Sequence, residues 1–166
     1  MVTCSWPRAE LTTLSYAVMK TAGPLATRLK VLSENQERAR LIADVLATDG
    51  TLPVQSYSDQ AAVARMAVVL KRPREELREV YDHLRASLRR LYRQRNMVLH
   101  GGKTRTASLR STLWTAAPIV GAGFDRIAHA HLVEKIAPRQ LAAQARLRLA
   151  HAGIPGEPHV SNLLGQ

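Results

Sequence analysis

The chain has 166 residues and a formal net charge of +11, with 24 Lys and Arg residues against 13 Asp and Glu. Its length suits one domain with a real core, and no apolar run reaches the ~18 residues that cross a bilayer. The only cysteine, Cys4, excludes an internal disulfide and a cysteine-ligated metal cluster. Since the first residues also lack the pattern of a signal peptide, we expect a cytoplasmic protein with no membrane association.

Helical periodicity dominates the chain, and strand-like alternation never lasts, so we expect an all-α fold. Ser33 and Gln36 have the spacing of a capping box for the third helix, and Ser58 is a candidate cap for the fourth. Asp49-Gly50 is a stop signal for the third helix. In chain order, the first four predicted helices span residues 9–20, 25–32, 34–48 and 59–70.

The longest predicted helix spans residues 73–99, with Pro73 in its first turn. Its apolar residues recur at alternating steps of four and three, which is typical of a seam that packs against another helix. Position 95 is the gap in this seam, and an arginine occupies it. A charged guanidinium at a helix-packing position costs several kcal/mol unless it is paired or solvated. The seam residues are Leu77, Tyr81, Leu84, Leu88, Leu91 and Val98.

Gly101-Gly102 is expected to end the long helix, letting the chain leave it at His100. A further helical region follows over 106–136, where Pro118 and the glycines at 121 and 123 should kink or split it. A shorter helix is predicted over 139–151. We therefore expect one helical domain, residues 1–151, followed by a flexible C-terminal tail, residues 152–166, which is rich in Pro and Gly.

Positive charge is concentrated around the long helix. Residues 71–110 contain twelve basic and four acidic side chains, so half of the positive charge lies in about a quarter of the chain. Such a surface attracts polyanions, and nucleic acid is the commonest polyanion in a cytoplasm. A generally basic protein whose charge serves solubility is the simpler interpretation. Aromatic residues are only 4% of the chain, which disfavours a base-stacking platform for single strands.

Motifs for metal, nucleotide or serine chemistry are missing from the sequence. There is no HExxH pair, no glycine-rich phosphate loop, no GxGxxG and no GxSxG. His129 and His131 are two residues apart, which places them on different sides of a helix. We expect neither a metal nor a cofactor.

The stretch "RNMVLHGG", residues 95–102, is the remaining candidate for chemistry. An arginine followed five residues later by a histidine occurs four times in the chain, so the spacing alone carries little weight. Three features distinguish this occurrence: Asn96 follows the arginine, two glycines follow His100, and Arg95 interrupts the apolar seam. The structural alternative is a histidine near a helix C-terminus, favourable with the dipole, and an arginine that extends to solvent.

This stretch resembles the R-N-x-x-x-H signature of HEPN domains, especially of the ApeA-like branch, in which glycines often follow the histidine. The match covers about ten residues and, more loosely, residues 59–136. The resemblance implies a small helical bundle with a long motif-bearing helix, and a metal-independent endoribonuclease of the toxin–antitoxin, phage-defence and CRISPR-associated systems. It also implies a homodimer in which two Arg/His sets face one cleft.

The resemblance assigns catalytic roles to Arg95, Asn96 and His100. His100 would be the general acid/base, and Arg95 would hold the scissile phosphate and stabilise its transition state. Asn96 would orient a phosphate oxygen or His100. The substrate's 2′-hydroxyl would be the nucleophile, giving a 2′,3′-cyclic phosphate and a 5′-hydroxyl.

The nearby cations are predicted to bind the RNA backbone, although a solvated helix face is an equal alternative. These residues are Arg89, Arg90, Arg93, Lys103 and Arg105. The competing function is a catalytically inactive HEPN-type module that binds nucleic acid or dimerises. An antitoxin or a larger defence protein is a further partner that the resemblance implies.

Overall fold

The computed structural model describes residues 1–101 and 107–164. Its described part is helical throughout, which confirms the all-α prediction. The helices are α1 (Val2–Met19), α2 (Pro24–Val31), α3 (Asn35–Asp49), α4 (Tyr57–Lys71), α5 (Pro73–Gly101), α6 (Ala107–Leu132) and α7 (Pro138–Ala150), followed by the short 3₁₀ helix η1 (Val160–Asn162). None of the described helices is both long enough and apolar enough to cross a membrane.

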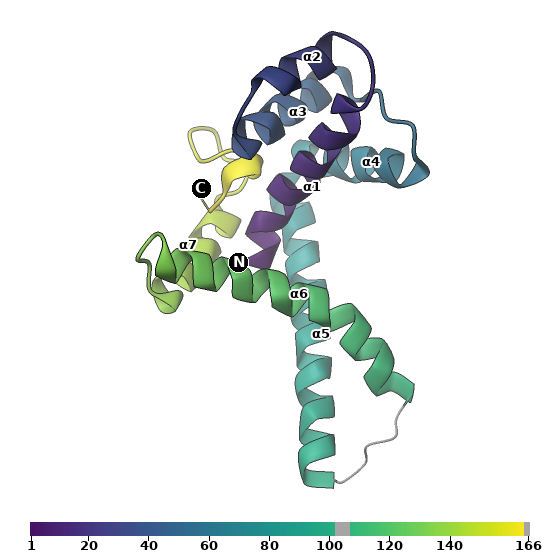
Figure 1. Ribbon diagram of the computed structural model, residues 1–166. Helices are drawn as coiled ribbons and strands as arrows, with labels where there is room; N and C mark the ends of the chain where they lie inside the picture. The colour runs from purple at the N-terminus through teal and green to yellow at the C-terminus, as the bar shows by residue number, and fades with distance from the viewer. Residues whose placement is uncertain (102–106, 165–166) are drawn as a thin grey trace.

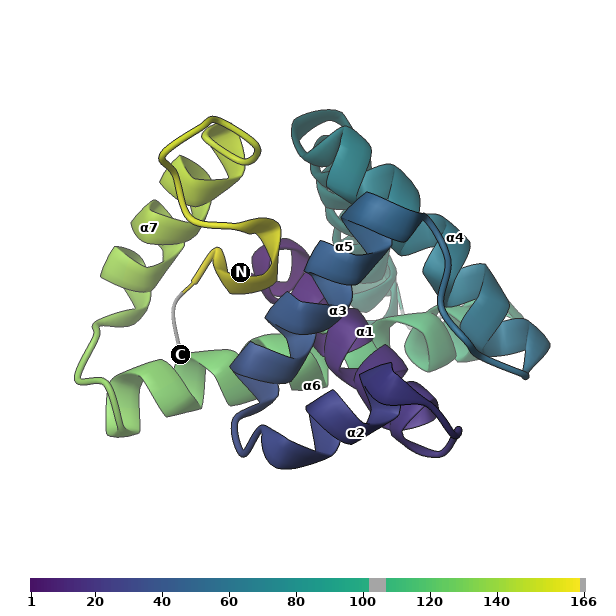
Figure 2. The same cartoon turned by 90° about the horizontal axis from the view of Figure 1, so that it is seen from above.

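Helix α1 is the centre of a compact body. It contacts α2, α3, α4 and η1, and α7 and the C-terminal segment lie on one side of it with α4 on the other (Figure 2). Its side chains Leu11, Leu14 and Val18 are completely buried, and Ile42 of α3 and Met66 of α4 join them in one core. The apolar face of α1 recurs at steps of three and four, which buries it on several neighbours at once.

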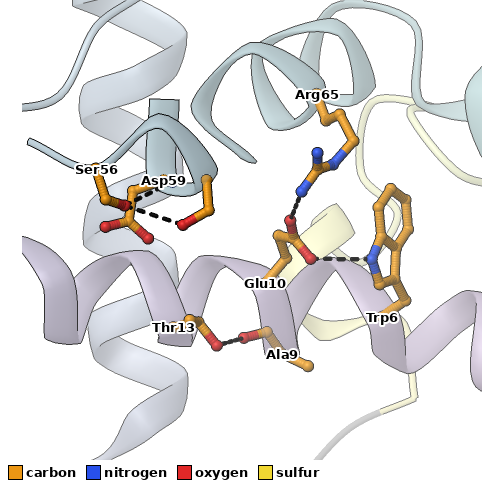
Figure 3. A network of polar contacts seen from close by, with 8 residues as sticks. Trp6, Ala9, Glu10, Thr13, Ser56, Asp59 and Arg65 are labelled. Carbon is orange, nitrogen blue, oxygen red and sulfur yellow. Dashed lines mark hydrogen bonds and ion pairs between the residues drawn. The ribbon is translucent and has the colours of Figure 1, made fainter. Parts of the chain in front are cut away.

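Polar contacts also fix α4 against α1 (Figure 3). Arg65 on α4 forms an ion pair with Glu10 on α1 at 2.5 Å, and the indole Nε1 of Trp6 donates to the other Glu10 oxygen at 3.2 Å. At the start of α4, the Ser56 hydroxyl accepts a hydrogen bond from the Asp59 backbone N–H at 3.1 Å. Ser56, and not the predicted Ser58, is therefore the N-cap.

Other boundaries also differ from the sequence expectations. Helix α1 begins at Val2 and contains Pro7, instead of beginning after that proline. Helix α3 has Glu34 at its N-cap with no side-chain cap, so the predicted capping box at Ser33 does not form. It ends at Gly50, whose φ of 72° is the left-handed conformation that glycine tolerates.

The C-terminal segment is packed and differs from the flexible tail expected from its proline and glycine content. Val160, Ser161 and Leu163 are buried, and the Arg126 side chain donates a hydrogen bond to the Leu164 carbonyl oxygen at 3.1 Å. Arg126 also forms a two-pronged ion pair with Glu134. Residues 152–164 therefore belong to the folded body rather than to a separate tail.

Helices α5 and α6 form an arm that extends away from the body. The first turns of α5 pack on the body through the buried Leu77, whereas its second half runs far beyond α1–α4 (Figure 1). Helix α6 is continuous from Ala107 to Leu132 and includes Pro118 and both glycines, so it is not split there. Helix α6 bends along its length. It crosses α5 and then diverges from it toward the outer end of the arm (Figure 1). We call the segments 81–101 and 107–124 the α5–α6 arm.

Candidate nucleic-acid interface

Only some residues of the predicted seam lie on the side of α5 that faces α6. Five of the partly buried residues in the outer half recur at steps of three and four, namely Leu84, Ser87, Leu91, Gln94 and Val98, and Asn96 lies off this row. Tyr81 and Leu88, which belong to the predicted seam, are instead 37% and 42% exposed. Helix α5 therefore has two adjacent strips, a partly buried one and a more exposed one that begins with Tyr81 and Leu88.

Arg95 lies seven residues after Leu88 and continues the more exposed strip. Its side chain is exposed, and Gln94 occupies the neighbouring position that faces α6. The desolvation cost that the sequence pattern assigned to Arg95 is therefore absent in a single chain, because the guanidinium remains in water. Of the two conditions under which a charged side chain is tolerated in this row, pairing or solvation, the single chain shows solvation.

The three predicted catalytic residues lie together at the outer end of the arm. Arg95 and His100 are exposed and Asn96 is partly buried. The Arg95 guanidinium Nη1 donates to the Asn96 side-chain oxygen at 3.2 Å. This contact holds the amide beside the guanidinium and leaves the remaining donors of Arg95 accessible to an anion.

His100 is still inside α5, because the helix continues to Gly101. The expectation that the chain leaves the helix at His100 is therefore wrong. Five residues of helix correspond to a rotation of about 140° and a rise of about 7.5 Å. Arg95 and His100 consequently point in different directions, and no hydrogen bond among the described residues joins them. One chain does not bring the two groups onto one phosphate.

The other Arg/His pairs with the same spacing differ in their environments. Arg126 is buried on Glu134, and His151 contacts the Glu157 carboxylate at 3.3 Å. These two side chains serve the body, whereas both Arg95 and His100 are accessible and have no carboxylate partner among the described residues. Arg78 and His83, the fourth pair, are likewise exposed on α5 without a carboxylate partner among the described residues, so exposure distinguishes the motif from only two of its three repeats.

The predicted RNA-binding arginines do not form one surface. The Arg90 guanidinium donates to the Ser87 hydroxyl at 3.1 Å, on the side of α5 near α6. Arg89 and Arg93 line a groove between α5 and α6, to which Arg90 does not contribute. Lys103 and Arg105 lie outside the described residues.

This groove, the α5–α6 groove, was not predicted from the sequence. It has a volume of about 860 Å³ and runs between α5, α6 and the first residues of the chain. The two adjacent strips of α5 were the available signal, but the sequence pattern alone merges them into one seam. The apolar side chains that line it include Tyr81, Leu84, Leu88, Val120, Phe124 and Ile127.

The described side chains with shifted pKa values lie in the body. The hydrogen bond from Arg126 holds the pKa of Glu134 below its ordinary value, although burial opposes this shift. Burial is also the main reason that the pKa of His159 is lowered. Among the described residues, no three His, Cys, Asp or Glu side chains come together as a candidate metal site.

Comparisons with known proteins add no relative. No family model, no curated protein and no solved structure matches the chain. The similarity to HEPN domains therefore rests on the residues of the motif and stays a prediction.

Proposed function

We propose that the protein is a metal-independent endoribonuclease in which Arg95, Asn96 and His100 from two copies of the chain form one composite site. The observation that carries this proposal is the accessibility of the motif. Arg95 and His100 are exposed at the outer end of a basic arm, and Asn96 is the one side chain among the described residues that binds the Arg95 guanidinium. A phosphate can approach both groups without displacing a structural contact.

The helical geometry supports a site shared between two chains. Within one helix, Arg95 and His100 diverge by about 140°, so a second copy has to supply the partner group. Apolar side chains beside the motif, Met97 at 52% and Leu99 at 59% exposed, provide contact area for such pairing. The homodimer is therefore part of the proposal and not an addition to it.

The proposed reaction requires only the substrate's own 2′-hydroxyl as nucleophile. One His100 takes the proton from this hydroxyl as its oxygen attacks the adjacent phosphorus, while the bond from phosphorus to the 5′-oxygen breaks. A water molecule gives a proton to that leaving oxygen, so the reaction needs a single His100. Arg95 stabilises the additional negative charge on the phosphate, as a charged donor does for developing anions. A toxin or phage-defence effector is the biological setting that the motif suggests.

The test is RNA cleavage by the purified chain in EDTA, with both ends of each product mapped. We expect 2′,3′-cyclic phosphate and 5′-hydroxyl ends, and no cleavage of DNA of the same sequence because DNA has no 2′-hydroxyl. Products with 3′-hydroxyl ends, or a requirement for Mg²⁺, would exclude the proposed chemistry. An RNA with a single 2′-deoxy nucleotide at the mapped site is the matched control and should remain intact there.

A catalytically inactive nucleic-acid-binding module is the second candidate. The observation that favours it is the divergence of Arg95 and His100 in a single chain, which leaves a basic arm without an assembled site. This function predicts equal binding of RNA and DNA, no cleavage, and no effect of His100→Ala on binding. Its affinity should fall steeply with salt, because phosphate contacts release counterions.

A further inference from the structure

The floor of the α5–α6 groove is apolar and accessible. Val120 is 47% exposed, Tyr92 61% and Phe124 70%, although all three line a concave surface. Monomeric proteins rarely leave contiguous apolar surface of this kind uncovered unless it binds something. Gly123 also lines the groove, where a Cβ would come within 3.3 Å of the Val2 side chain. A larger residue at this position would intrude on the end of the groove near the N-terminus.

The two edges of the groove differ in charge. Arg85, Arg89 and Arg93 form the edge on α5, and each lies four residues after the previous one. No hydrogen bond or ion pair joins these three arginines to another described residue. The lining residues from α6 are uncharged. The groove therefore has one row of available cations along one side of an apolar floor.

The spacing of the arginines matches a second helix. Four residues of α-helix rise about 6 Å, so the three guanidinium-bearing positions follow one another at this interval. Carboxylates at positions i, i+4 and i+8 of another α-helix have the same interval. Apolar residues at i, i+3, i+4 and i+7 of such a helix would form the face that enters the groove.

We propose that the α5–α6 groove binds an amphipathic α-helix of a partner protein, with a row of Asp or Glu side chains facing Arg85, Arg89 and Arg93. The apolar face of the partner helix covers Leu88, Val120 and Phe124. The arginine row sets the orientation and the preference for an acidic partner. This inference rests on the groove and its charge, and it is independent of RNA cleavage.

Other occupants fit the groove less well. A second copy of this chain carries a net charge of +11 and brings its own arginine row, so like charges would face each other across the contact. RNA supplies phosphates, but the floor is mainly apolar, and the hydroxyls of Thr3, Tyr81 and Tyr92 are few partners for base edges. A small amphiphilic anion has one head group, whereas the arginine edge extends over about 12 Å of helix from Arg85 to Arg93.

Two synthetic helical peptides test the proposal directly. One has leucines at i, i+3, i+4 and i+7 and a flanking row of glutamates, and the other has lysines in place of those glutamates. The readout is an environment-sensitive dye on Val120→Cys, a position inside the groove. The native Cys4 is only 2% exposed, so it stays unlabelled in the folded protein.

We expect the glutamate peptide to shift the dye signal and to bind at least about tenfold more tightly than the lysine peptide. The combined variant Arg85→Glu, Arg89→Glu and Arg93→Glu should reverse this preference. The matched control replaces Arg90, Arg139 and Arg146 by glutamate, which gives the same net charge away from the groove. It should change the affinity for the glutamate peptide by less than about twofold. Circular dichroism checks that each variant is folded.

Three results would overturn the proposal. The first is equal affinity for the two peptides on the wild-type protein, a comparison that needs no folded variant. The second is an equal loss of affinity in the matched control, which would mean that the peptide binds through overall charge. The third is a dimer, detected by sedimentation, that Phe124→Asp dissociates, because a second copy would then be the occupant of the groove.

Discussion

The body and the α5–α6 arm have similar sequence patterns, but their apolar side chains differ in how far they are buried. On α1, the apolar residues at helical spacing include Leu11, Leu14 and Val18, and all three are fully buried. On the arm, Leu88 and Tyr92 also lie at helical spacing, but they are 42% and 61% exposed. Burial of such side chains is the main source of folding stability. The body therefore supplies the stability of the fold, and the arm carries apolar and cationic surface for contacts outside the chain.

This difference explains why function and stability should respond to different substitutions. In the Arg126–Glu134 pair of the body, Arg126 is buried, Glu134 is partly buried, and Arg126 is also joined to the C-terminal segment. Arg95 on the arm contacts Asn96 and is otherwise available. Changes in the body should unfold the protein without specific effects on RNA, and changes on the arm should alter activity without unfolding it.

The largest effect is expected from substitutions at the outer end of the arm. His100→Ala should lower the rate of RNA cleavage by ~10²–10⁴-fold, since removing a proton-transfer group typically has this cost. The melting temperature should remain that of the wild type, because His100 is exposed. His131→Ala, at another exposed histidine, this one on α6 and outside the motif, is the matched control and should keep full activity. A variant at His100 that cuts RNA at the normal rate would remove this residue from the site.

Replacing a leucine by alanine should lower the free energy of unfolding more in the body than on the arm. Leu14→Ala in the body should lower the free energy of unfolding by about 2–5 kcal/mol, since it leaves a cavity in a fully packed core. Leu88→Ala on the arm should cost less than about 1 kcal/mol, because its side chain is already partly in water. Urea unfolding of both variants measures the difference. Equal losses would show that the arm belongs to the same cooperative core as the body.

The ion pair between Arg126 and Glu134 should make the stability of the body depend on acid pH. The pKa of Glu134 is lowered in the folded state, so its contribution is complete above the unfolded value of about 4.3 and is lost as pH falls through the folded value. At pH 7, Glu134→Gln should cost about 1–3 kcal/mol by leaving the buried Arg126 without its anion. The difference in stability between the variant and the wild type should shrink as the pH falls from about 4.3 through the lowered folded pKa of Glu134. A constant difference at every pH would contradict the assignment.

The smallest predicted effect is a gain of stability on the arm. The side-chain oxygen of Gln94 is buried without a hydrogen-bond partner among the described residues. Gln94→Leu removes this unsatisfied group and places an apolar side chain toward α6, so it should raise the free energy of unfolding by about 1 kcal/mol. Thermal unfolding measures it, with Gln140→Leu at an exposed position of α7 as the control. A loss of stability would mean that the glutamine oxygen is satisfied in solution.

Helix content and most helix positions were predictable because helical periodicity is a local property of the chain. The starts of α3 and α4 were less predictable, since Ser33 and Ser58 are both plausible caps and only the three-dimensional path selects Ser56 as the N-cap of α4. The burial of Val160 and Leu163 depends on contacts with α1 and α3, far away in sequence. Pro and Gly content alone predicted a flexible tail there.

The candidate site was only partly predictable for a related reason. The sequence identified Arg95, Asn96 and His100, and the structure shows the first two in contact. The sequence pattern predicted one seam where α5 has two adjacent strips. Steps of three and four do not distinguish a strip against α6 from one beside it. The α5–α6 groove needs the crossing of two helices and the N-terminus, which no local pattern encodes.

The most direct test of the central claim mixes two inactive chains. Arg95→Ala and His100→Ala proteins are purified separately, unfolded and refolded together, and assayed for RNA cleavage in EDTA. In a composite site, each mixed dimer retains one Arg95 and one His100 from different chains. The mixture should therefore regain measurable activity, whereas each variant refolded alone should not. If the mixture stays as inactive as its components, the two groups do not act across a dimer, and the composite ribonuclease site is wrong.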